Sequence, residues 1–230
     1  EVNMGLSHSP SIATNGLILS LDAENQKSVG NGTQWYNLVA SNGVTKISSP
    51  TIGTKGGATC YIFDNAGDRF QSTPLGIPNP QNVLTLEAWI YPEPNITSGD
   101  RMNIVRANSG GNRAYLSYNK SNNRISNYWY GTSNQGYHET VSYTPGRNVW
   151  QHFCCTWDGS TIRQYVNYEY KGSASTASQN QTFGTEIQIG WEGNGRQFSG
   201  GISIIRIYNR ALNDDEVKYN FNSHRERFGV

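Results

Sequence analysis

The chain has 230 residues, of which 35% are hydrophobic and only 15% are charged, and its formal net charge is +1. Because Lys and Arg are scattered along the chain, the sequence lacks the basic stripe that nucleic-acid-binding proteins use, and we expect no nucleic-acid partner. Its apolar stretches are far shorter than the roughly 20 residues that span a bilayer, so we also expect no membrane segment. At this length we expect one domain.

Short runs rich in β-branched and aromatic residues recur along the chain, with turn-forming pairs such as Asn42-Gly43 and Gly110-Gly111 between them. This spacing is typical of an all-β sandwich or barrel. The predicted strands are residues 16–23, 59–63, 84–91, 102–107, 114–118, 125–130, 138–143, 149–157, 161–168, 186–191 and 198–209.

Two local signals stand out near the end of the chain. Asp158-Gly159 lies between two β-rich runs and predicts a hairpin. Asn213 and Glu216 have the spacing of a capping box, and Val217 and Phe221 follow on one helical face. We therefore expect one short C-terminal helix, whose acidic first turn stabilises the helix and does not form a catalytic cluster.

The cysteines Cys60, Cys154 and Cys155 are odd in number. Because neighbouring strand residues point to opposite faces, Cys154 and Cys155 cannot share one environment. We expect all three to be small buried side chains without a disulfide.

Seven segments in chain order share their pattern with one known family. They are Gly16–Ala23, Phe63–Phe70, Leu86–Ile90, Trp150–Gly159, Tyr165–Asn167, Ile189-Gly190 and Ile205–Leu212. Together they resemble the laminin-G-like members of the concanavalin A-like lectin/glucanase superfamily. The resemblance implies a jelly-roll β-sandwich of two antiparallel sheets over residues 16–212, preceded by an N-terminal extension (1–15) and followed by a C-terminal helix and tail (213–230) packed on the same domain.

The ends of the chain resemble a narrower group. Ser7–Pro10 and Asn220–Gly229 look like the family members encoded by tailed bacteriophages, notably those of cyanobacteria. This resemblance implies a virion structural protein of the capsid or tail, at the virion surface after assembly in the host cytoplasm.

Two departures from the family pattern carry expectations. Ile202–Ile205 replaces a segment in which many relatives carry two carboxylates, one of them beside calcium, which weakens the case for a metal. Asn167–Tyr170 replaces the family's Asn-Gly hairpin, which predicts a longer or reshaped turn.

Catalytic groups are not evident. A retaining glycosidase needs two carboxylates about 5–5.5 Å apart, whereas Glu87 is alone on its strand. We expect Glu87 to be tied to a loop or to face water, with a role in binding as the alternative, and His152 to be a hydrogen-bonded residue of the sandwich. The sequence therefore predicts a protein that is not an enzyme.

Aromatic rings among amides and hydroxyls are the mixture that sugar recognition requires. This mixture occurs around residues 127–138 and again near residue 191. Its candidate carbohydrate-binding residues are Tyr128, Trp129, Tyr130, Asn134, Gln135, Tyr137, Trp191 and Arg196. The same residues would equally suit a protein–protein interface or cross-strand packing.

A calcium site is a further candidate, because Asp64, Asn65 and Asp68 place several oxygens within one turn, as in lectin-like relatives. The alternative is an Asx-type turn in which the carboxylates accept backbone N–H groups.

Two functions follow as hypotheses. The first is a decoration module of a tailed phage that binds other virion subunits or itself, forming a homo-oligomer. The second is a carbohydrate-binding adhesin that recognises cell-surface glycans. The two hypotheses are compatible, since one particle can carry both functions.

Overall fold

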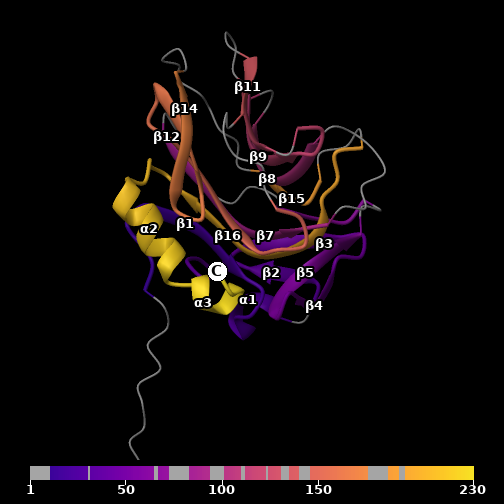
Figure 1. The fold of residues 1–230 in the computed structure, drawn as a ribbon. Helices are drawn as coiled ribbons and strands as arrows, with labels where there is room; N and C mark the ends of the chain where they lie inside the picture. Colours follow the sequence, from indigo (N-terminus) through magenta and orange to yellow (C-terminus); the bar gives the residue numbers. More distant parts are fainter. Residues whose placement is uncertain are drawn as a thin grey trace, which may run out of the picture.

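The structure is a computed structural model of the chain. It describes residues 11–30, 32–64, 67–72, 83–93, 101–109, 112–122, 124–130, 135–139, 146–175, 186–191 and 195–230, with only the backbone at 108–109, 112–113, 128–130 and 135–139. The strands within these residues form two antiparallel sheets, which confirms the predicted all-β sandwich (Figure 1).

Sheet A has the order β14-β13-β12-β7-β16-β5-β4, and β1 also pairs with β16. Its central strand, β16, pairs with three others: β7 along most of its length, β5 near its start and β1 near its end. The strands are β1 (Leu17–Asp22), β4 (Thr51–Lys55), β5 (Ala58–Asp64), β7 (Leu84–Pro92), β12 (Gln151–Trp157), β13 (Thr161–Val166), β14 (Glu169–Ser175) and β16 (Ser199–Tyr208).

Sheet B has the order β11-β10-β9-β8-β15-β6-β3-β2. Its strands are β2 (Gln34–Tyr36), β3 (Gly43–Ile47), β6 (Arg69–Gln71), β8 (Arg101–Ser109), β9 (Asn112–Asn119), β10 (Arg124–Tyr130), β11 (Gln135–Glu139) and β15 (Glu186–Ile189). The strand predicted at 138–143 thus begins earlier, and residues 140–143 lie outside the described residues.

The main core fills the space between the sheets, because alternate residues of each strand point inward. Trp35, Tyr61 and Phe70 pack against one another there, with ring centroids 4.6–5.4 Å apart; Tyr61 and Phe70 meet edge to face, and the other two pairs are tilted. Such aromatic contacts add to the stabilisation that burial of their area provides.

Two helices cover the outer face of sheet A (Figure 1): α2 (Asp214–Asn222) and α3 (Arg225–Phe228). The predicted capping box of Asn213 and Glu216 is present at the start of α2. On the sheet, the Trp89 ring stacks on Phe228 at 4.1 Å and on Phe221 at 5.5 Å. Two four-residue helices, α1 (Gln26–Val29) and α3, were not predicted.

The two predicted local features of the central strands have different outcomes. Asp158-Gly159 forms the β12–β13 turn as expected. The next turn is not longer, because Asn167 and Tyr168 both take a left-handed conformation, with φ of 48° and 64°, and make a two-residue turn into β14.

Two further expectations are confirmed. Cys60, Cys154 and Cys155 are buried free thiols, and Cys154 and Cys155 lie on opposite faces of sheet A. Among the described residues, no helix has the length and apolar character needed to cross a membrane.

Candidate functional site

The outer face of sheet B carries a row of polar residues across adjacent strands. Gln188 is the Cα partner of both Gln71 and Arg106, and Arg106 is the partner of Tyr115. Directly opposed residues of antiparallel strands point to the same face, so these side chains lie side by side. A parallel row contains Asn103, Ser117 and Ser126.

These polar side chains are buried although they lie outside the hydrophobic core. Asn103 is 1% exposed, Gln188 6% and Arg106 9%. Nε of Arg106, Oε1 of Gln188 and Oδ1 of Asn103 have no hydrogen-bond partner in the described part of the chain. An unsatisfied buried polar atom costs about 1–3 kcal/mol, and folded proteins leave few of them. Among the described residues, the row therefore contains one donor and two acceptors without a partner.

One edge of this row has an aromatic neighbour. The Arg69 guanidinium lies 4.4 Å from the centroid of the half-buried Trp191 ring, and Asn103 Nδ2 donates to the Trp191 carbonyl at 2.9 Å. The backbone N–H of Asn103 also donates to the Arg196 carbonyl at 3.2 Å. The structure thus brings two predicted carbohydrate-binding residues, Trp191 and Arg196, to the same place as Asn103.

The opposite end of the row continues into the hairpin of β10 and β11. Tyr128 is the Cα partner of Tyr115 on one side and of Tyr137 on the other, and Tyr130 pairs with Gln135. Trp129 pairs with Gly136. Asn134 and the side chains of the other predicted residues of this hairpin lie outside the described part of the chain. By backbone register Tyr128 and Tyr137 continue the row of Gln188, Arg106 and Tyr115, whereas the position of Trp129 is on the opposite face of the sheet.

Two of the predicted calcium residues are described: Asp64 ends β5, and Asp68 precedes β6. Asp68 Oδ1 accepts the backbone N–H of Ser49 at 2.8 Å, and Oδ2 accepts that of Asp64 at 3.2 Å. Burial raises the pKa of Asp68. The carboxylate thus accepts backbone N–H groups, as the alternative expects, but from residues that precede Asp68 and not from the residue two positions on that defines an Asx turn. Asn65 lies outside the described residues, and within them no group of three His, Cys, Asp or Glu side chains is placed to hold a metal. Calcium binding stays a prediction.

Glu87 differs from the expectation that it meets a loop or water. It is completely buried on the outer face of sheet A, where Arg206 Nη1 donates to Oε1 at 2.7 Å and Asn220 Nδ2 donates to Oε2 at 2.7 Å. His152 Nε2 lies 3.2 Å from Oε1. Burial alone would raise the pKa of Glu87, but Arg206 and the hydrogen bonds lower it to about 2. The expectation was wrong because α2 covers this position.

The two antiparallel sheets define the class of all-β sandwich proteins. Residues 64–218 match the family model described as "Concanavalin A-like lectin/glucanases superfamily", of the Laminin_G_3 type. The chain therefore belongs to this superfamily, as its motifs predicted. No curated protein sequence matches it.

Solved structures share the fold at low sequence identity. The binding domain of Paraclostridial Mosquitocidal Protein 1 has a TM-score of 0.70 at 16% identity, over 91% of this chain and 52% of that one. The botulinum neurotoxin serotype G binding domain has a TM-score of 0.66 at 16% identity (89% and 50%). A Trypanosoma rangeli sialidase has a TM-score of 0.65 at 16% identity (95% and 34%). The chain thus spans about half or less of these proteins.

Proposed function

We propose that the chain is a non-catalytic carbohydrate-binding module that recognises surface glycans through the outer face of sheet B. The observation that carries this proposal is the set of unsatisfied atoms on the buried side chains of Asn103, Arg106 and Gln188, of which Asn103 also donates to the backbone carbonyl of Trp191. We call these four residues the sheet B site.

The chemistry of the sheet B site suits a sugar. A hydroxyl group both donates and accepts hydrogen bonds, so it can accept from Arg106 Nε while it donates to Oε1 of Gln188 or Oδ1 of Asn103. The Trp191 ring offers the flat apolar surface on which the C–H groups of a pyranose pack. Placement of these groups on adjacent strands fixes their spacing before the ligand arrives, which lowers the entropy cost of binding.

The comparisons support recognition as the general role. Two of the similar structures are described as binding domains, and the others include a sialidase in complex with a sugar derivative. Because the chain spans half or less of each of them, their activities extend to this chain only as part of the proposal.

The test is a glycan array followed by affinity measurement on the best ligand. We expect Arg106→Ala and Trp191→Ala to lower the affinity about tenfold or more, because each removes a direct contact worth about 1–2 kcal/mol. Arg163→Ala is the matched control, since Arg163 lies on sheet A and pairs with Asp158. Wild-type affinity in both sheet B variants, with their folding verified by circular dichroism, would refute the site.

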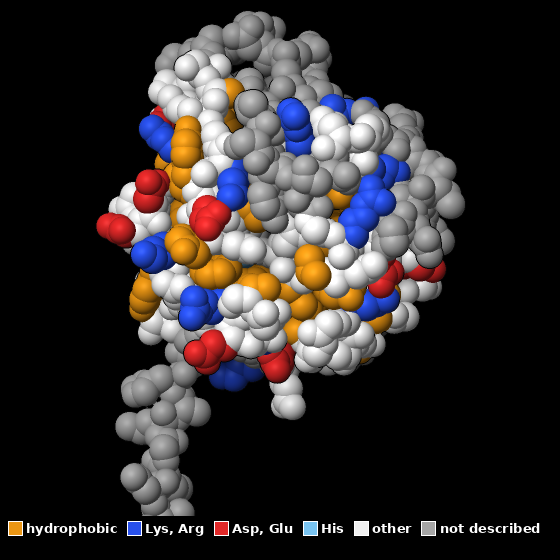
Figure 2. Space-filling view, in the orientation of Figure 1, with side chains coloured by type: hydrophobic (Ala, Val, Ile, Leu, Met, Phe, Trp, Pro, Cys, Tyr) orange, Lys and Arg blue, Asp and Glu red, His pale blue; other side chains and the backbone are white. Residues whose placement is uncertain are grey.

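A second candidate is the virion structural module implied by the chain ends. In its support, exposed apolar side chains such as Ile52, Val149 and Tyr170 are available for protein contacts, and hydrophobic groups run across the face that bears the helices (Figure 2). Light scattering after size-exclusion chromatography, with calcium and then with chelator, tests it. A defined oligomer in both conditions supports assembly, whereas a monomer in both argues against a self-assembling module.

A further inference from the structure

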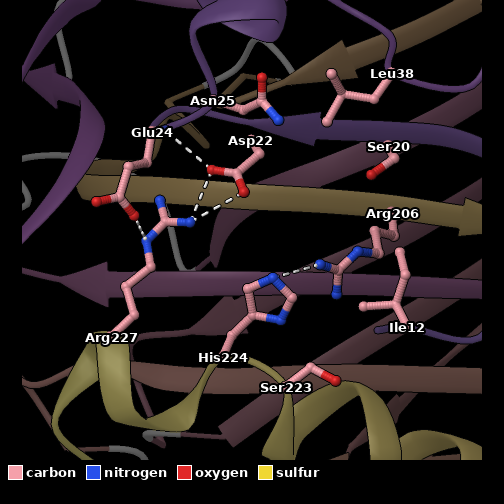
Figure 3. Close-up of a pocket in the computed structure, with 10 residues that line it drawn as sticks. All are labelled: Ile12, Ser20, Asp22, Glu24, Asn25, Leu38, Arg206, Ser223, His224 and Arg227. Carbon is pink, nitrogen blue, oxygen red and sulfur yellow. Dashed lines mark hydrogen bonds and ion pairs between the residues drawn. The ribbon is translucent and has the colours of Figure 1, made fainter. Parts of the chain in front are cut away.

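A cavity of about 290 Å³ lies on the other side of the sandwich, between the end of β1, the strand β16 and the C-terminal helices (Figure 3). Ser20 and Arg206 are Cα partners on β1 and β16, and both side chains project from the outer face of sheet A toward the cavity. Small-molecule sites span roughly 300–1,000 Å³, so this cavity suits a ligand about as large as one sugar ring.

Two arginines give the cavity a fixed polar wall. Arg227 Nη1 donates to both oxygens of Asp22, at 2.8 and 3.0 Å, and its Nε lies 2.5 Å from Glu24 Oε2. A guanidinium fork held by two carboxylates is rigid, so the Asp22 carboxylate is fixed in position. Figure 3 shows the Asp22 carboxylate turned toward the Arg227 guanidinium.

Arg206 supplies an unused donor. It is 2% exposed, its Nη1 is bonded to Glu87, and its Nη2 lies 3.1 Å from His224 Nε2. Its Nε has no hydrogen-bond partner in the described part of the chain. Since burial lowers the pKa of His224 to about 4, that ring is neutral at physiological pH and accepts from the guanidinium.

The charges select against ions. The cavity wall carries two carboxylates, Asp22 and Glu24, and two guanidiniums, Arg206 and Arg227, so its formal charge is balanced. An anion that approached Arg206 would meet the Asp22 carboxylate, and a cation that approached Asp22 would meet Arg206 and Arg227. A neutral ligand with alternating donors and acceptors meets neither repulsion.

The cavity also has an apolar part, formed by Ile12 and by Leu38, which is 39% exposed. The amide of Asn25 lies above Asp22 in Figure 3, where it caps α1 through Oδ1. Carboxylate, guanidinium and amide planes beside aliphatic side chains match the hydroxyl edge and the C–H face of a saccharide.

We infer that this cavity is a second binding site, for a single neutral monosaccharide unit of a glycan, and we call it the sheet A pocket. It is distinct from the sheet B site, because the two lie on the outer faces of opposite sheets. Because the two sites face away from each other, a chain with both sites is suited to bridge two glycan strands, and not to bind one flat glycan surface through both sites at once.

The experiment is a titration of the ¹⁵N-labelled full chain with methyl glycosides of galactose, glucose, mannose and N-acetylglucosamine, followed by two-dimensional NMR. We expect at least one glycoside, at millimolar concentration, to shift the Arg206 Nε–H signal and the backbone amides of Asn25 and Leu38. Inorganic phosphate is titrated in parallel and is expected to leave these signals unchanged.

Leu38→Trp fills the mouth of the pocket and is expected to weaken the glycoside at least tenfold. Val39→Trp is the matched control, because Val39 is the exposed neighbour outside the pocket, and it is expected to bind normally. Asn25→Asp retains the helix cap while it removes the amide donor, and is expected to weaken binding several-fold.

Two results would overturn the sheet A pocket: no glycoside shifts its signals, or phosphate shifts them and the glycosides do not. Arg106→Ala separates the two sites. If that variant loses glycan binding while the pocket signals stay silent in the wild type, only the sheet A pocket fails. If the pocket signals shift but glycan binding ignores Arg106 and Trp191, only the sheet B site fails.

Discussion

The outer faces of both sheets bury polar side chains, and on both faces some of their atoms have no hydrogen-bond partner in the described part of the chain, such as Arg206 Nε on sheet A and Arg106 Nε on sheet B. The faces differ in that only sheet A carries a charged network that reaches the C-terminal helices. On sheet A, Glu87 is bonded by Arg206 from β16 and by Asn220 from α2, so charge and hydrogen bonds are used within the chain. On sheet B, Arg106 and Gln188 retain atoms with no partner in the described part of the chain. The first arrangement ties the C-terminal helices to the sheet, and the proposed function assigns the unpaired atoms of the second to a ligand.

The largest expected effect is on sheet A. Glu87→Ala leaves the Arg206 guanidinium buried without its carboxylate, so we expect the free energy of unfolding to fall by about 3–5 kcal/mol. Urea denaturation followed by circular dichroism measures this loss. The double variant Glu87→Leu with Arg206→Met is expected to recover much of it, because no unpaired charge then remains. A loss below about 1 kcal/mol in the single variant would show that the network is not structural.

The next largest effect is the loss of stability in acid, because His224 contacts Arg206 in the same network. Burial and Arg206 lower its pKa to about 4 in the folded chain, whereas the unfolded chain titrates near 6.5. The unfolded state therefore binds the extra proton first, and stability falls as the pH drops from 6.5 to 4, by roughly 3 kcal/mol at most. His224→Gln retains an acceptor for Arg206 and is expected to remove this pH dependence. An unchanged profile in the variant would assign the acid sensitivity to other groups.

On sheet B we expect a substitution to change the affinity for a glycan and to leave the free energy of unfolding almost unchanged. Gln188→Met removes an unsatisfied oxygen together with one hydrogen bond to Glu186, so we expect the free energy of unfolding to stay within about 1 kcal/mol of the wild type. The affinity for the best glycan should fall about tenfold. Thermal melts and isothermal titration measure the two quantities on one sample. A large loss of stability with intact binding would reverse the roles of the two faces.

The smallest expected effect is the loss of an exposed ion pair, which gives a reference for the buried pair of sheet A. Arg163 Nη1 lies 2.9 Å from Asp158 Oδ2, but the two side chains are 41% and 33% exposed. Arg163→Ala is expected to lower the free energy of unfolding by about 0.5 kcal/mol or less, and less again in high salt. Urea denaturation at low and high salt measures it. A loss as large as that of Glu87→Ala would mean that burial does not explain the difference in stability expected between the Arg163–Asp158 and Arg206–Glu87 pairs.

The sequence predicts features that are encoded locally. The Asp158-Gly159 turn and the Asn213–Glu216 capping box need only neighbouring residues, and both are present. Strands β4 and β14 were missed because their residues are mostly exposed or half-buried, so they carry no clear hydrophobic alternation. The turn at Tyr168 was missed because a tyrosine with φ of 64° departs from the usual Gly.

The candidate sites were less accessible to sequence reasoning. Glu87 and Arg206 are 119 residues apart, and nothing near either residue indicates that they meet. Arg106 and Gln188 alternate with apolar residues, as side chains that face water do, so their burial depends on the folded chain. Trp191 was selected because it is an aromatic residue among polar neighbours in the sequence. This selection does not require knowledge of which strands are paired.

The position of β16 has a consequence for biosynthesis. This strand pairs with β1, β5 and β7, yet it is synthesised after all three of them. While the ribosome synthesises the intervening residues, β1 has no strand to pair with, and the edges of β5 and β7 that later meet β16 stay open. Vectorial folding of sheet A therefore waits for residues 199–208, and a chain that stops before them exposes strand edges prone to aggregation.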